Sequence, residues 1–188
     1  MTHASSERRP VPKWVPRLWS HARREDGMAT IEFVILFPIF FFLLVSSVEI
    51  GFITHRHTML DRAVDLTVRD IRLGTGSAPQ YEQIRDAICD RATVIKNCHD
   101  NVKIEMIRMD LRAWVPPPAD YDCIDHAEPV QPVRNFVNGM QNEMMLLRIC
   151  AMFEPVFPLA GLGRDLMKVS TNGYVAMISA TAFVQEPT

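Results

Sequence analysis

The chain has 188 residues, of which 48% are hydrophobic, and its 20 Lys and Arg against 22 Asp and Glu give a formal net charge of -2. This length accommodates one ordinary domain with a membrane anchor, and the balanced charge argues against a nucleic-acid-binding protein. With 8 Gly and 13 Pro, the composition excludes collagen-like and low-complexity classes.

The first predicted elements are a leader and a membrane-spanning helix. Residues 1–27 combine three prolines, two tryptophans and mixed charge without a hydrophobic period, so we expect a disordered cytoplasmic leader. Residues 33–48 hold no charge, and 31–53 as a helix would be about 34 Å long, enough to cross a hydrocarbon core of about 30 Å. No signal-peptidase site follows Ile53, so we expect this single span to be retained in the lipid.

The charges on either side of the span predict its orientation. Six Lys and Arg precede it, from Arg8 to Arg24, and four Arg follow it within about 20 residues, from Arg56 to Arg72. This bias favours a cytoplasmic N-terminus and a C-terminal domain outside the cytoplasm.

Two glutamates lie within the span. Glu49 is about one turn from its end and is followed by His55 and Arg56, so we expect its side chain to snorkel to the interface. Glu32 immediately precedes the uncharged run. An ionisable residue inside a span is a functional hypothesis, and its natural partner is a cation.

The start of the span carries a motif around Glu32. The sequence reads RREDGMATIEF, in which a Gly is followed by five residues ending in Glu, then by Phe and an apolar helix. This resembles the processing site of type IV prepilins and pseudopilins, where a prepilin peptidase cuts after the Gly. The resemblance implies cleavage between Gly27 and Met28. It also implies that the carboxylate of Glu32, at mature position five, pairs with the new Met28 amine of a neighbouring subunit.

The whole anchor resembles the TadE/TadF/TadG-like proteins of Flp (Tad) pilus assembly. It has an early Glu32-Phe33, Pro38 in its first half, a second glutamate at Glu49 and a small residue, Gly51, soon after. The order of the later segments is similar too, although a long Pro-rich loop departs from it. The resemblance implies a pseudopilin-like minor component that primes or anchors a pilus at the inner membrane and supports adhesion. Its partners would be other pilins, the assembly platform, the prepilin peptidase and lipid.

Two helices are predicted outside the membrane. The spanning helix should continue to Leu73 and end at the glycine-rich stretch 74–77. A second helix is expected at 79–95. The apolar face of the first helix consists of Leu60, Ala63, Val64, Thr67, Val68 and Ile71, and that of the second of Ile84, Ile88 and Ile95.

Strands are predicted in the rest of the external domain, residues 74–188. Alternation predicts a half-buried strand over 102–106, in which Lys103 and Glu105 form the polar face, and a more buried strand over 145–153. A last strand is expected at 174–185, and a short helical turn at 159–166. We therefore expect an α+β fold with a sheet of three or four antiparallel strands.

The segment 114–135 carries five prolines and is predicted to be a long surface loop. A structureless loop of this length is uncommon in a compact domain and often has a binding role, although the sequence favours the alternative, an ordered but inert insertion. The loop supports an alternative function, that of an uncleaved single-pass membrane protein whose external domain is a binding module.

Four cysteines, Cys89, Cys98, Cys123 and Cys150, allow three disulfide connectivities. An external location would place them in an oxidising compartment. We favour Cys89–Cys98, across a helix end and a turn, and Cys123–Cys150, which would attach the long loop to a strand.

No motif for catalysis or cofactor binding stands out in the sequence. It lacks G-x-S-x-G, a Walker loop and H-E-x-x-H, so we expect no enzymatic activity. A zinc site would need close Cys or His pairs, and His55 and His57 are better explained as solvated residues just outside the membrane. We expect no metal, no cofactor and no nucleic-acid partner.

Overall fold

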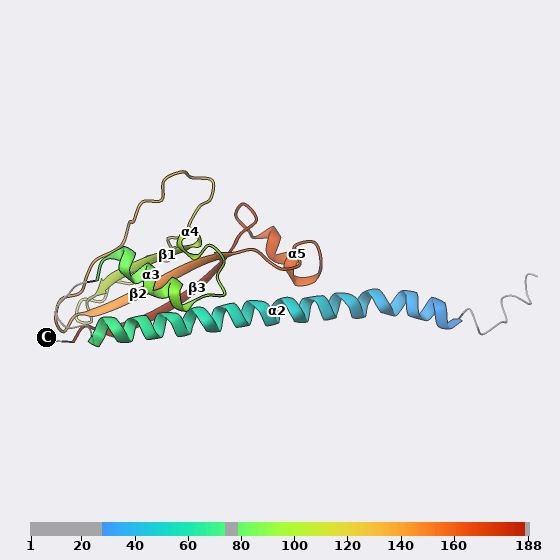
Figure 1. Cartoon of the computed structure of the whole chain (residues 1–188), viewed down its shortest axis with the longest axis horizontal. Coiled ribbons are helices and arrows are strands. Elements are labelled where there is room, and N and C mark those ends of the chain that lie inside the picture. Colours follow the sequence, from blue (N-terminus) through green and yellow to red (C-terminus); the bar gives the residue numbers. More distant parts are fainter. Residues whose placement is uncertain (1–27, 74–78, 187–188) are drawn as a thin grey trace, which may run out of the picture. The chain divides into compact units, whose positions relative to one another are not determined.

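The computed structural model describes residues 28–73 and 79–186 and shows an α+β fold (Figure 1). The predicted leader at 1–27, including Gly27, and the stretch at 74–78 lie outside the described residues. By its contacts the chain divides after Phe42 into two units, the second of which is Leu43–Thr188. Helix α2, Met28–Leu73, runs through both units and confirms the predicted long helix.

The first unit contains the most apolar part of α2. Its large apolar side chains from Ile31 onward are exposed, and the rings of Phe33, Phe37 and Phe41 stack at centroid distances of 5.0 and 6.0 Å. In the part of the chain that the structure describes, α2 is the one helix long and apolar enough to cross a membrane. Such a continuous apolar surface is compatible with lipid and costly in water.

The second unit is built on a three-stranded antiparallel sheet in the order β1-β2-β3 (Figure 1). The strands are β1, Val102–Met109; β2, Met144–Phe153; and β3, Val175–Val184. The predicted fold class is confirmed, with the smaller of the two expected strand numbers.

The C-terminal part of α2 packs on one face of this sheet. All six residues of its predicted apolar face are buried, and all except Thr67 share a core cluster with inward-facing strand residues such as Ile104 and Ile149. Polar contacts add to this packing, because the Ser179 hydroxyl donates to the Asp61 carboxylate at 2.5 Å. The candidate membrane helix α2 therefore also forms one wall of the α+β domain.

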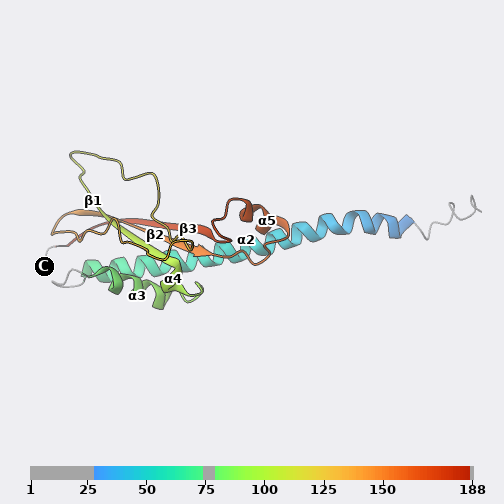
Figure 2. The same cartoon turned by 90° about the horizontal axis from the view of Figure 1, so that it is seen from above.

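Helix α3, Tyr81–Arg91, lies beside α2 and completes this core with Ile84 and Ile88 (Figure 2). It is shorter than the predicted 79–95, because the helix ends at Ala92 and the β-branched run Thr93-Val94-Ile95 follows in a turn. Helix α4, Cys98–Asn101, then leads directly into β1.

The expectation that β1 is half buried is wrong. Val102, Ile104 and Met106 face α2, but Lys103 and Glu105 on the opposite face are also buried, at 4% and 3% exposure. The segment between β1 and β2 covers that face, and it adds to the edge of β1 where the Met106 amide donates to the Asn135 carbonyl at 2.8 Å. The sequence pattern showed the polar residues but not the segment that covers them.

Candidate functional site

The pilin-like motif lies at the start of α2. Gly27 is outside the described residues, and Met28 is the first residue of the helix. Glu32 is exposed one turn later, in the apolar first unit, and the ring of its neighbour Phe33 stacks on Phe37. The Glu32 carboxylate is thus placed on an apolar helix surface, where lipid or another helix would surround it.

Glu49 does not snorkel as expected, because it is fully buried at 0% exposure. Its two carboxylate oxygens accept hydrogen bonds from the backbone amides of Val156 and Phe157, at 3.0 and 2.8 Å. The preceding residue, Pro155, has no amide hydrogen, so these two are the first donors after the turn that follows β2. The buried Glu49 carboxylate is therefore paired with two backbone donors of the segment that follows β2.

A second polar contact fixes the same segment to α2. The Leu162 amide, at the start of helix α5 (Gly161–Lys168), donates to the Ser46 hydroxyl at 3.1 Å. The N-cap residue of α5 is Ala160, whose side chain has no acceptor, so Ser46 serves as its cap from another helix. Ser46 and Glu49 together attach residues 155–163 to the helix.

The close approach in this contact requires a glycine. A Cβ atom on Gly163 would lie 2.3 Å from the Phe157 carbonyl oxygen and 3.4 Å from a Glu49 carboxylate oxygen. Backbone cannot yield as a flexible side chain would, so any larger residue at 163 would displace the segment that Glu49 holds.

Buried charges hold the Pro-rich loop on the outer face of the sheet. Lys103 pairs with Asp122 at 2.8 Å, and Glu105 pairs with Arg148 at 2.6 Å. The Arg148 guanidinium also donates to the carbonyls of Pro118 and Asp120, at 2.6 and 3.2 Å. The loop has no regular secondary structure, as predicted, but these contacts hold it against the outer face of the sheet.

All four cysteines lie within the described residues and all are paired. The favoured pairing is confirmed: Cys89 is bonded to Cys98, and Cys123 to Cys150. The first bond joins the end of α3 to α4, and the second joins the Pro-rich loop to β2, next to the buried ion pairs.

We expect the two disulfides to differ in their effect on stability. A chain-entropy estimate gives about 2.5 kcal/mol for the 9-residue separation of Cys89 and Cys98 and about 3.5 kcal/mol for the 27-residue separation of Cys123 and Cys150. Paired Cys→Ala substitutions, compared by urea unfolding in detergent, measure both. A larger loss for the Cys89–Cys98 variant would contradict this order.

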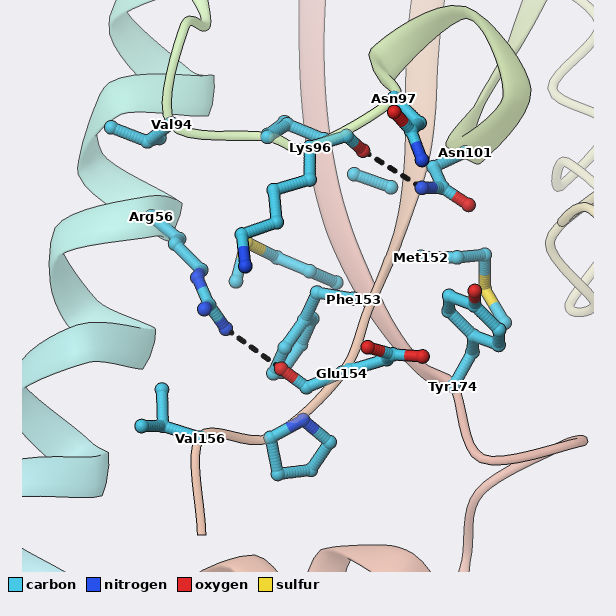
Figure 3. A pocket seen from close by; sticks show the side chains of 14 residues that line it. Arg56, Val94, Lys96, Asn97, Asn101, Met152, Phe153, Glu154, Val156 and Tyr174 are labelled. Carbon is cyan, nitrogen blue, oxygen red and sulfur yellow. Dashed lines mark hydrogen bonds between the residues drawn. The ribbon is translucent and has the colours of Figure 1, made fainter. Parts of the chain in front are cut away.

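A cavity of about 300 Å³ lies between α2, the turn before α4 and the end of β2 (Figure 3). The side chains of Arg56, Lys96 and Asn101 reach into it, and the Arg56 guanidinium donates to the Glu154 carbonyl at 3.1 Å. The Asn101 side-chain oxygen is buried, with no hydrogen-bond partner among the described residues. The cavity therefore offers cationic donors beside apolar walls, whereas the Asn101 oxygen is not accessible from it.

The histidines near the membrane are partly held by other groups. His55 is exposed, whereas His57 contacts the Asp61 carboxylate at 2.9 Å and the Ile178 carbonyl at 3.2 Å. Within residues 28–73 and 79–186, no group of three or more His, Cys, Asp and Glu side chains is arranged to hold a metal ion.

Sequence reasoning missed the polar contacts at Glu49 and Ser46 and the close approach at Gly163. It also missed the buried pair of Glu105 and Arg148, although one signal was present. Each residue is a charged residue within an apolar strand, and the two charges are opposite. In antiparallel strands such residues are complementary when the register places them together.

These features define a small α+β domain attached to, and partly built from, a long helix with an apolar N-terminal half. The model of the TadE-like protein family matches residues 27–69, from the predicted cleavage site to the domain-facing part of α2. The resemblance seen in the sequence is thus confirmed over the anchor. The later segments lie outside the matched residues, and their similarity stays a prediction. Comparison with curated proteins and with solved structures finds no match for the chain.

Proposed function

We propose that the chain is a membrane-anchored, pseudopilin-like minor component of a Tad (Flp) pilus system, which primes or anchors the pilus at the inner membrane and supports adhesion. The observation that carries this proposal is the match of residues 27–69 to the TadE-like family. The matched stretch contains the Gly27-Met28 junction, Glu32 and the apolar span. The role is structural, without enzymatic activity.

The proposed mechanism depends on Glu32. Its carboxylate is exposed on the apolar part of α2, where lipid offers it no hydrogen-bond donors. A charge taken out of water is costly unless it is paired. Cleavage after Gly27 would create an amine at Met28, and pairing of Glu32 with the amine of a neighbouring pilin would fix the register between subunits.

The external domain fits the same proposal. Two disulfides are consistent with a periplasmic location, in keeping with the charge bias that places the N-terminus in the cytoplasm. The partners proposed are other pilins, the inner-membrane assembly platform and the prepilin peptidase.

A second candidate function is that of an uncleaved anchor carrying a binding module. Several large apolar side chains are exposed between β1 and β2, which would suit contact with a partner. They are Leu111, Trp114, Val115, Val130 and Met140.

The mature N-terminus distinguishes the two functions. In cells with the prepilin peptidase we expect a chain that begins at Met28. Because the full chain of 188 residues has a mass of 21.5 kDa, loss of the 27-residue leader should lower the mass by roughly 3 kDa. Gly27→Leu, or loss of the peptidase, should leave the full-length protein in the membrane. Intact mass and N-terminal sequencing of the membrane-extracted protein give the answer. A wild-type chain that starts at Met1 beside an active peptidase would support the binding module.

The same strains test the role of Glu32. Glu32→Gln should insert normally, because removing a carboxylate makes the span more apolar, but it should reduce the number of pili. Glu154→Gln makes the same chemical change at an exposed residue and serves as the control. Wild-type pilus numbers in the Glu32→Gln strain, at matched protein level, would remove the proposed pairing.

A further inference from the structure

Residues 155–169, which follow β2, are attached to α2 inside its apolar span. The attachment points are Ser46 and Glu49, which bind the amides of Leu162, Val156 and Phe157. Ser46 and Glu49 precede Ile53, the predicted end of the span, by seven and four residues. At the rise of an α-helix they lie about 10 and 6 Å deeper than Ile53 along the axis. The contacts therefore hold this segment at the depth of the outer leaflet rather than above it.

The exposed side chains of the segment suit that depth. Leu159 is 88% exposed and Val169 is 77% exposed, at the two ends of α5. Inside the helix, Leu162 and Leu166 share one face and are partly buried, whereas Arg164 and Lys168 lie on the other side and are exposed. A short helix with apolar residues on one side and cations on the other is typical of a membrane interface.

The charges of α5 favour phospholipid over hydrocarbon alone. Arg164 and Lys168 outnumber the single acid, Asp165, which the Lys168 ammonium contacts at 2.5 Å. The hydrogen bond from Lys168, and then its charge, lower the pKa of Asp165. The segment thus keeps an excess positive charge, and such charge is attracted to anionic headgroups.

We propose that residues 155–169 are a membrane-contact segment that lies in the outer leaflet of the bilayer. Leu159 and Val169 contact acyl chains, and Arg164 and Lys168 reach the phosphate layer. The domain then rests on the lipid surface beside its own anchor instead of standing clear of it. This inference rests on the proposed membrane anchoring of α2.

Quenching by brominated lipid tests the proposal in the full-length protein. The native Trp14, Trp19 and Trp114 are replaced by Phe, and one Trp is introduced by Leu159→Trp. The protein is reconstituted in vesicles of phosphatidylethanolamine and phosphatidylglycerol, with or without bromine on the acyl chains. Because bromine quenches only at short range, we expect the emission to fall to roughly half in brominated vesicles for a residue buried at the headgroup and acyl boundary.

Three further variants make the outcome specific. Val169→Trp should be quenched as Leu159→Trp is. Leu111→Trp replaces a residue of 66% exposure beyond the other end of the sheet, and its emission should not change. Phe41→Trp, within the span, reports whether α2 is in the lipid at all.

Quenching at Phe41 without quenching at Leu159 and Val169 would overturn the membrane-contact segment and leave the anchor intact. Equal quenching at Leu111 and Leu159 would also overturn it. Failure at Phe41 would overturn the membrane anchoring itself.

Discussion

Glu49→Ala is expected to detach residues 155–163 from α2. The substitution removes the fully buried carboxylate that accepts from the amides of Val156 and Phe157, and each donor left unsatisfied away from water costs about 1–3 kcal/mol. We expect a loss of about 2–5 kcal/mol in the free energy of unfolding, well above the effect of most surface substitutions. A Glu49 side chain that snorkels to the interface, as the sequence predicted, would lose little stability on this substitution. A large loss would therefore show that the carboxylate is buried.

Hydrogen exchange of the purified protein in detergent measures this locally. Exchange at Val156 and Phe157 should be faster by roughly 30-fold or more in Glu49→Ala, since about 2 kcal/mol corresponds to that factor. Glu154→Gln, a nearby exposed glutamate, is the control and should change neither exchange nor stability. Unchanged exchange at both amides in Glu49→Ala would show that the carboxylate does not hold the segment.

The second large effect is expected where Glu105 meets Arg148 beneath the Pro-rich loop. Arg148→Met leaves the Glu105 carboxylate buried, with the Asn135 amide as its remaining partner at 2.9 Å. It also removes the donors that bind the Pro118 and Asp120 carbonyls. Breaking one side of a buried ion pair costs about 3–5 kcal/mol, and we expect a loss of stability in that range.

Replacing both charges should cost much less than the two single losses together. Glu105→Leu combined with Arg148→Met leaves no buried charge without a partner, and such exchanges are often near neutral. Urea unfolding of the wild type, both single variants and the double variant in detergent yields the coupling energy. Additive losses would mean that the two side chains do not depend on each other for their stability.

The fold was largely predictable because its elements follow strong local patterns. The buried face of α2 from Leu60 to Ile71 has a helical period, and β2 lies within one residue of its predicted start at Met145. The pairing of Cys123 with Cys150 was also favoured from the sequence, because this disulfide would attach the long loop to a buried strand.

The errors about burial have one physical source, which is contact between residues far apart in the chain. Glu49 was judged by its distance from the end of the span, yet its partners are 107 and 108 residues later. Lys103 and Glu105 were judged by strand alternation, and the segment that buries them has no periodic pattern. Local sequence shows which residues are polar, but only the tertiary fold shows whether water reaches them.

The long separation of these contacts has a consequence for the order of biogenesis. The residues of α2 that face the domain find their partners on β2, the segment after it and β3, up to 121 residues later, as at His57 and Ile178. If the anchor inserts first, Glu49 and the apolar face from Leu60 stay uncovered until those strands have been translocated. Contacts of such high sequence separation form slowly, so under this order of events the apolar face of α2 stays exposed until export of the later strands is complete. If the domain is exported as proposed, a chaperone or a partner subunit that shields this face would act in that interval.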